Sequence, residues 1–164
     1  AGGDPAAADE VARWNPDIVL LQEAPRPAAV RALARRLFGA ERDAAVGLDT
    51  AVLARGLFPR LLDRRTASAR VPLASGGHLE VASVRLNPTL LRVDLWNPAC
   101  WRAFADDRRN RRAELEAVLA RLPDSPGPLL VGGDLNAPAG DGALAPLAGR
   151  GLRDAWGDAG AGWG

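Results

Sequence analysis

Two short apolar runs constrain the fold of this chain more than any other feature of its sequence. Residues 17–22 (DIVLLQ) and 128–132 (PLLVG) consist mainly of Ile, Val and Leu. Such runs are typical of strands covered on both faces, because a strand with one face in water alternates apolar and polar residues. Segments with apolar residues at helical spacing lie between these runs and other strand-like segments. The alternation predicts an α/β architecture.

Helices are expected where apolar side chains recur every three or four residues, and strands where short apolar segments are bounded by Pro or Gly. The expected helices are 5–14, 27–38, 106–122 and 142–148. The further expected strands are 50–55, 60–71, 78–86 and 152–156. The helix at 106–122 has the clearest pattern, with Asp106 as the expected N-cap. Residues 87–105 before it are expected to be irregular.

Length and charge exclude several classes of protein. The 164 residues suit one domain, and we expect residues 1–164 to form a single one. The 21 basic and 20 acidic residues nearly cancel, so bulk charge does not indicate a protein that coats a polyanion. The sequence has no run of about 18 apolar residues, so we expect no transmembrane helix. The first ten residues lack the apolar region of a signal peptide, which favours the cytoplasm over other locations but does not determine the location.

Every basic residue is Arg, and Ala, Gly and Pro are abundant, which we interpret as a coding bias. Arg richness is therefore a weak indication of function. The single cysteine, Cys100, excludes an internal disulfide and a Cys-rich metal site. It lies between Trp96 and Trp101, an apolar setting that favours a buried, unreactive thiol over a nucleophile. The single histidine, His78, follows two glycines and is expected to be an exposed turn residue rather than a ligand.

Glu23 ends the first apolar run, in the segment PDIVLLQE (16–23). A carboxylate buried at the end of an apolar strand is costly unless it is paired or binds a metal. Strand ends of an α/β sheet are also where binding sites gather. In the alternative interpretation, Glu23 simply reaches solvent where the chain leaves the sheet.

The second run leads into the segment LLVGGDLNAPAGD (129–141). Side chains two residues apart in an extended chain point to the same side, so Asp134 and Asn136 are expected to face one spot. A carboxylate can hold a water or a metal, and an amide can donate hydrogen bonds to an oxyanion. The glycines before them allow another group or a ligand to approach the backbone closely. In the alternative interpretation, Asp134 and Asn136 only cap turns.

Together the two segments resemble the endonuclease/exonuclease/phosphatase superfamily, the DNase-like metal-dependent phosphoesterases. Residues 17–23 resemble the family strand whose Glu binds the metal, and residues 133–136 resemble its GDxN segment. Three further segments resemble the family in the same order, namely 47–56, 108–122 and 152–156. The resemblance implies a two-sheet α/β sandwich flanked by helices.

The sequence also departs from the family pattern. The family has an Asn on a strand before the Glu strand and an Asp-His pair near its end. Neither is found here, so we expect a domain truncated at both ends. The family strand that corresponds to 78–86 ends in a His, where this sequence has Arg85. Arg has a permanent charge and a forked geometry suited to phosphate, but it cannot act as a base. We expect Arg85 to face phosphate, with a surface position at the strand end as the alternative.

The segment 87–105 is the expected specificity element. Its residues Trp96 and Trp101 are candidates for stacking on a base or sugar, or for contact with lipid. The alternative is a small satellite core beneath a long loop. The arginines that follow either contact a phosphate backbone or form a solvated helix face, and the composition favours the second reading. They are Arg108, Arg109, Arg111 and Arg112.

The resemblance implies metal-assisted hydrolysis of a phosphoester by a monomer. Glu23 is expected to hold Mg²⁺ or Mn²⁺, and Asp134 to orient or deprotonate the attacking water. Asn136 and Arg85 are expected to hold phosphate oxygens. Nucleic acids, inositol phosphates and lipid phosphodiesters are the expected substrate classes. Two other classes stay open: a catalytically impaired relative that binds a phosphorylated ligand, and an α/β interaction domain in which the motifs are structural.

Overall fold

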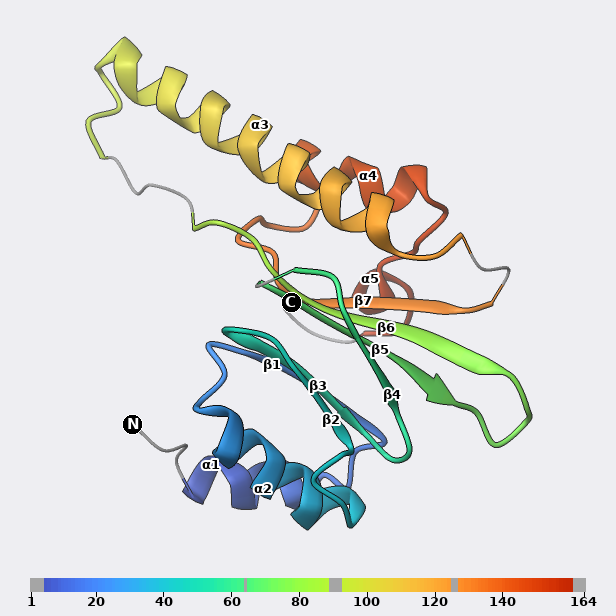
Figure 1. The fold of residues 1–164 in the computed structure, drawn as a ribbon. Coiled ribbons are helices and arrows are strands. Elements are labelled where there is room, and N and C mark those ends of the chain that lie inside the picture. Colours follow the sequence, from blue (N-terminus) through green and yellow to red (C-terminus); the bar gives the residue numbers. More distant parts are fainter. Residues whose placement is uncertain (1–4, 64, 89–92, 125–126, 161–164) are drawn as a thin grey trace. The chain divides into compact units, whose positions relative to one another are not determined.

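The computed structural model describes residues 5–63, 65–88, 93–124 and 127–160 (Figure 1). The chain divides into two compact units. The first consists of residues 1–86 and 123–135, and the second of residues 87–122 and 136–164. Every strand of the described chain belongs to the first unit, which therefore contains both sheets.

The first unit is built on a three-stranded sheet, in the order β1-β3-β2, and a four-stranded sheet, in the order β4-β5-β6-β7. Its helices are α1 (Pro5–Arg13) and α2 (Pro27–Phe38). Its strands are β1 (Ile18–Gln22), β2 (Ala44–Val46), β3 (Thr50–Ala54), β4 (Phe58–Leu61), β5 (Thr66–Pro72), β6 (His78–Arg85) and β7 (Leu129–Asp134). Neighbouring strands are antiparallel except β6 and β7, which are parallel. This architecture confirms the predicted two-sheet α/β sandwich.

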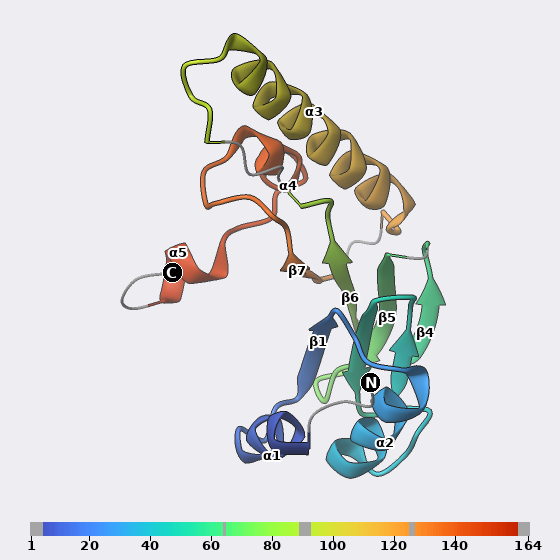
Figure 2. The same ribbon diagram turned by 90° about the vertical axis from the view of Figure 1, so that its left-hand side faces the viewer.

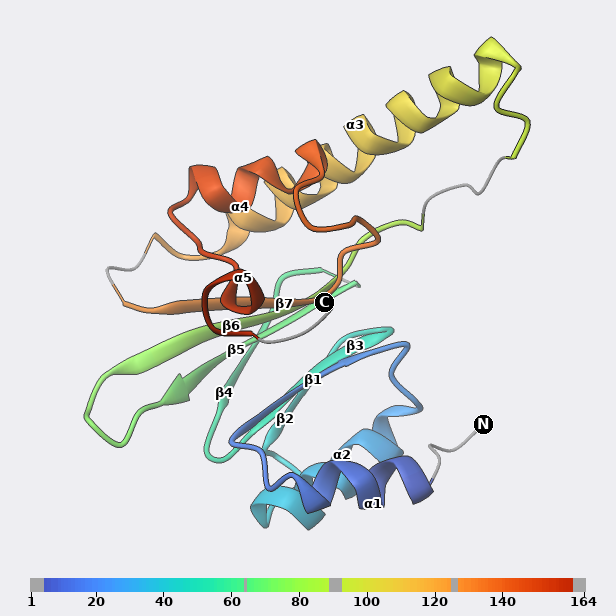
Figure 3. The same cartoon turned by 180° about the vertical axis from the view of Figure 1, so that it is seen from behind.

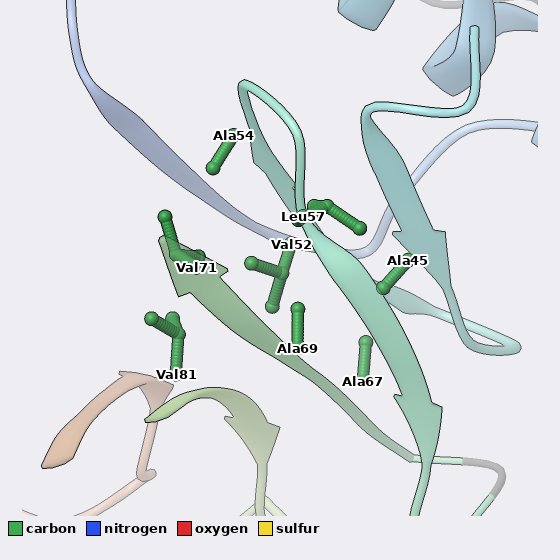
Figure 4. Close-up of a cluster of buried hydrophobic side chains, with 8 residues drawn as sticks. All are labelled: Ala45, Val52, Ala54, Leu57, Ala67, Ala69, Val71 and Val81. Atoms are coloured by element: carbon green, nitrogen blue, oxygen red, sulfur yellow. The ribbon is translucent and has the colours of Figure 1, made fainter. Parts of the chain in front are cut away.

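A core of small and branched apolar side chains fills the space between the two sheets (Figure 4). Its members are Ala45, Val52, Ala54, Leu57, Ala67, Ala69, Val71 and Val81. β3 is buried along its whole length, because its alternate residues Ala51 and Leu53 belong to a second core on the opposite face. The apolar strand β1 is likewise covered on both faces: Leu20 packs against the first core and Val19 belongs to the second.

The second core lies between the three-stranded sheet and the helices α1 and α2, which cover its outer face (Figure 2). The buried face of α2 consists of Val30, Ala34 and Phe38, at the spacing that the sequence predicted. The helix ends where Gly39 adopts a left-handed conformation with φ of 101°. A glycine tolerates this conformation without steric cost, so the sequence itself stops the helix.

The second unit consists of helices: α3 (Pro98–Arg121), the short 3-10 helix η1 (Gly142–Leu144), α4 (Ala145–Gly149) and α5 (Ala155–Ala159). The predicted apolar stripe of α3 is buried: Leu115, Val118, Leu119 and Leu122, with Cys100 nearer the start of the helix. η1 and α4 pack against α3, and Figure 3 shows α4 beside α3. Arg150 fastens the helix end by donating to the carbonyl oxygens of Leu119 and Leu122.

The start of α3 corrects the sequence prediction. The helix begins at Pro98 rather than at Asp106, so the end of the segment 87–105 is not irregular. Its N-cap is Asn97, whose side chain accepts a hydrogen bond of 2.9 Å from the backbone N–H of Ala99. Asn followed by Pro is a strong start signal, because Pro at the first helical position lacks only an N–H that has no partner there.

Two strand predictions were also wrong. Residues 60–71 do not form one strand, because β4 ends at Leu61 and β5 begins at Thr66, and between them Asp63 accepts a hydrogen bond from the backbone N–H of Arg65. Residues 152–156 do not form a strand, because the side chain of Asp154 caps the first turn of α5. In both places an Asp competes with the extended conformation by bonding the backbone two residues on.

Gly133→Ala is expected to lower the free energy of unfolding by roughly 2–5 kcal/mol, because backbone strain and overpacking add. Gly133 has φ of 140°, and a Cβ built on it would lie 2.0 Å from the carbonyl oxygen of Val84. Gly39→Ala is the matched control, because φ is 101° there but no atom lies within 4 Å of the added Cβ. Urea denaturation should show a larger loss of unfolding free energy for Gly133→Ala than for Gly39→Ala. Equal losses would mean that the backbone near Gly133 shifts away from β6 without destabilising the fold.

Candidate active site

Arg85, the last residue of β6, joins two carboxylates in the first unit. Its Nη2 donates to Oε1 of Glu23 at 2.7 Å, and its Nη1 donates to Oδ2 of Asp49 at 2.9 Å. The side chain of Arg85 is 28% exposed and that of Asp49 is 22% exposed, whereas that of Glu23 is 73% exposed. The guanidinium of Arg85 therefore bonds two carboxylates at once, one largely exposed (Glu23) and one largely buried (Asp49).

Strand pairing explains why Glu23 and Asp49 meet. β1 and β3 are antiparallel and pair Gln22 with Thr50, so the residue after β1 lies beside the residue before β3. The backbone N–H of Ala24 donates to the carbonyl oxygen of Asp49 at 2.9 Å and ties the two loops together. The sequence analysis missed Asp49; the signal was an Asp directly before the apolar strand TAVLA, at the start of the partner of β1.

A second set of bonds fixes the end of β1 against β6. The side-chain amide of Gln22 donates to Oγ of Ser83 at 3.0 Å, and that hydroxyl donates to the carbonyl oxygen of Leu21 at 3.0 Å. Ser83 is fully buried. These bonds hold Glu23 next to Arg85 although 62 positions separate the two residues in the chain.

Glu23 differs from its prediction in one respect. The sequence analysis singled out Glu23 because a buried carboxylate is costly, but this cost does not arise, since the side chain is largely exposed. Its backbone has φ of 49°, in the left-handed region that residues other than Gly rarely adopt. Such conformations persist where the surrounding structure holds them, and they concentrate at binding sites. Glu23 is thus both paired and held in an unusual conformation.

The pKa of Arg85 is raised above its ordinary value, chiefly because its side chain donates a hydrogen bond to Asp49. Burial acts in the opposite direction, and the negative charges of Glu23, Asp49 and Asp134 raise the pKa further. Among the described residues, Nε of Arg85 and Oδ1 of Asp49 are buried without a hydrogen-bond partner. Arg85 therefore stays protonated, and the group retains an acceptor and a donor for a further molecule.

Asp134 is the last residue of β7 and pairs in register with Arg85 across the parallel ladder. Its carbonyl oxygen accepts a hydrogen bond of 2.9 Å from the N–H of Leu86. The space beside the two preceding glycines is occupied by other parts of the protein. A Cβ on Gly132 would lie 2.7 Å from the side chain of Leu20, and Gly133 lies against β6. The close approach that the sequence indicated is thus made by β1 and β6.

Asn136 does not continue the strand. β7 ends at Asp134, and Asn136 has φ of 47°, so the same-side argument for an extended chain does not hold for this pair. Asn136 also belongs to the second unit, together with Trp96 and Trp101. The exposed fractions of Trp96 and Trp101 are 84% and 58%. The roles of these three residues stay predictions from the family motif and from residue type.

The residues of the first unit fit a hydrated hard cation. Within the described residues, no group of three or more His, Cys, Asp or Glu side chains could hold a metal ion. Mg²⁺ usually keeps several waters and binds through one or two carboxylates, so it does not need such a group. Glu23 supplies an exposed carboxylate, and the buried Oδ1 of Asp49 supplies an acceptor to which no donor of the described chain bonds. The Glu23 carboxylate suits a direct ligand to the cation, and Oδ1 of Asp49 suits an acceptor for a water bound to the cation.

Comparison with known proteins identifies the family. The sequence profile described as "Endonuclease/Exonuclease/phosphatase family" matches residues 2–164. The chain belongs to this family. The family assignment confirms the resemblance found in the sequence, and the enzymes that its description names are hydrolases of phosphate esters. No curated protein shows significant similarity to the family member described here.

A solved structure shows the same fold. The crystal structure of SmcL superposes with a TM-score of 0.58 at 16% sequence identity, over 91% of this chain. The chain spans 62% of the length of SmcL, so it corresponds to less than two thirds of that protein. At this identity the similarity supports the fold of the family member and nothing finer. In the described part of the chain, no helix is long and apolar enough to cross a membrane.

Proposed function

We propose that this family member hydrolyses a phosphate ester by attack of a water molecule, assisted by Mg²⁺ or Mn²⁺. The observation that supports this most is Arg85, which stands at the end of β6 between Glu23 and Asp49 and pairs in register with Asp134. A fixed cation and several carboxylates at neighbouring strand ends are the groups that phosphoryl transfer needs.

In the proposed mechanism, Glu23 holds the divalent ion, which would withdraw negative charge from the phosphate when bound. Arg85 donates to a non-bridging phosphate oxygen with the Nη2 group that otherwise bonds Glu23. Asp49 keeps the guanidinium in place through Nη1. The proposed role of Asn136, donation of its amide to a phosphate oxygen, rests on the family motif alone.

Asp134 orients the attacking water and takes its proton. The water oxygen forms a bond to phosphorus while the bond between phosphorus and the leaving alcohol oxygen breaks. The leaving oxygen then receives a proton from solvent and Asp134 releases the proton it took to solvent, so that one water is consumed for each ester cleaved. A carboxylate positioned as a general base contributes roughly 10²- to 10⁴-fold to such a rate.

A second candidate is a family member that binds a phosphorylated ligand without turnover. The observation in its favour is that Arg85 replaces the family His and already occupies Oε1 of Glu23. An activity panel separates the two: bis(p-nitrophenyl) phosphate, DNA, an inositol phosphate and phospholipid vesicles, each with Mg²⁺ or Mn²⁺. We expect turnover of at least one class. Binding of a phosphorylated compound without any turnover would support the second candidate instead.

Arg85→His is expected to make activity depend on pH near neutrality. The raised pKa of Arg85 lies above the pH range of an assay, so its charge, and any stability that its ion pairs add, are lost only in strong alkali. His loses its charge near pH 6.5, so we expect kcat/KM of the variant to fall about tenfold between about pH 5.5 and 8 relative to Arg85→Lys. Parallel pH profiles for the two variants would exclude a role for the positive charge.

A further inference from the structure

A pocket of about 560 Å³ lies within the second unit. α3 and the segment around Pro138 and Asp141 form its walls. The volume falls in the range of small-molecule binding sites, roughly 300–1,000 Å³. None of its lining residues is among those proposed for hydrolysis.

Arg111 lines this pocket and is 4% exposed. It continues the buried stripe of α3 one turn before Leu115, a position where an apolar side chain is expected. Within the described chain, its Nε and Nη1 are buried without a hydrogen-bond partner. Burial of a guanidinium whose donors have no acceptor is costly, and an anionic ligand with acceptor oxygens removes that cost.

Two acidic residues near Arg111 bond other groups. Asp141 lies 3.3 Å from Nε of Arg108 and accepts from the backbone N–H of Ala143 at 2.8 Å. Glu114, one turn along α3, accepts from the backbone N–H and the side-chain amide of Asn87. Two arginines and one aspartate line the pocket, which leaves an excess of positive charge.

The lining of the pocket includes a fixed aromatic ring. Nε1 of Trp101 donates to the carbonyl oxygen of Leu95 at 2.8 Å, which fixes the plane of the indole. The rings of Trp101 and Phe104 are tilted by 50°, with centroids 6.3 Å apart. Trp101 stays 58% exposed, so a flat ring can stack on it.

We infer that this pocket binds a nucleotide, with the phosphate on Arg111 and the base on Trp101. A base attached to a phosphate satisfies both unusual features of the pocket, because the phosphate accepts from the buried guanidinium and the base covers the exposed indole. This inference does not depend on the proposed hydrolysis, since it concerns binding by the second unit alone.

Isothermal titration of the chain with adenosine monophosphate tests the inference. We expect binding, with adenosine and inorganic phosphate each at least about tenfold weaker because each satisfies one half of the pocket. Arg111→Met should weaken binding of the nucleotide roughly 10- to 100-fold. Arg112→Gln is the matched control: Arg112 is the next residue, is 54% exposed, pairs with Glu116 and should leave the affinity unchanged.

Two further variants distinguish a failure of this inference from a failure of the proposed hydrolysis. Trp101→Ala should weaken the nucleotide about tenfold but not inorganic phosphate, and it serves if Arg111→Met does not fold. Glu23→Gln should leave nucleotide binding unchanged, so a failure of the hydrolytic proposal is seen separately. The inference is overturned if adenosine monophosphate does not bind, if Arg111→Met binds it as tightly as the wild type, or if anionic phosphatidylserine vesicles bind through Arg111 and the nucleotide does not.

Discussion

Asp134→Asn is expected to lower kcat for phosphoester hydrolysis by roughly 10³-fold, because the amide cannot take the proton of the attacking water. The change is nearly isosteric, and Asp134 meets β6 through backbone pairing and its carbonyl oxygen, both of which the variant keeps. The fold should therefore survive. Initial rates on the substrate found in the activity panel, with Mg²⁺ in excess, measure the effect.

Asp9→Asn is the control for this variant. Asp9 lies on α1 and pairs with Arg36 on the surface, where a salt bridge contributes at most about 1 kcal/mol. We expect wild-type rates from it and circular dichroism spectra of both variants that match the wild type. Should Asp134→Asn retain more than a tenth of wild-type kcat, Asp134 is not the base and the proposed mechanism is wrong at its central step.

Glu23→Gln is expected to abolish the response of activity to Mg²⁺ and to weaken Mg²⁺ binding at least about tenfold, since a carboxylate binds this hard cation far better than an amide does. Stability should change by less than about 1 kcal/mol, because the side chain of Glu23 is largely exposed and Arg85 keeps its ion pair with Asp49. Titration calorimetry with Mg²⁺, followed by rates at saturating Mg²⁺, measures both quantities.

The comparison variant is Glu41→Gln, which removes a carboxylate paired with Arg35 on the surface. It should bind Mg²⁺ and turn over substrate as the wild type does. Equal Mg²⁺ affinity in Glu23→Gln and the wild type would remove Glu23 from the metal site. In that case Asp49, whose buried Oδ1 has no hydrogen-bond partner among the residues that the structure describes, becomes the residue to change next.

Sequence patterns predicted the elements whose conformation depends mainly on their own residues. β1 and α2 were found from apolar periodicity alone, because each covers the core with an unbroken pattern and each is bounded by Pro or Gly. The start of α3 was missed because Asn97 and Pro98 were counted as part of an irregular segment rather than as a cap. β2, with three residues, is too short to show a pattern of its own and owes its conformation to β3.

The sequence named candidate site residues but not their arrangement. Glu23 and Asp134 were singled out because each stands at the end of an apolar strand, and Arg85 because it occupies the position of a His in the resembling family. Their contacts depend on the pairing of β1 with β3 and of β6 with β7, which no local window contains. Asp49 was missed for the same reason. Arg111 was interpreted as part of a solvated helix face, but it is 4% exposed, because α3 packs against segments distant in the sequence, which no local window shows.

The measurement that tests the account most directly is turnover of the best phosphoester of the panel by the full chain, with EDTA and then with added Mg²⁺ or Mn²⁺. The account predicts that EDTA abolishes turnover, that either cation restores it in the wild type, and that neither restores it in Glu23→Gln. Turnover that persists in EDTA, or a Glu23→Gln variant that Mg²⁺ activates as it does the wild type, would contradict the proposal that Glu23 holds the ion for metal-assisted hydrolysis.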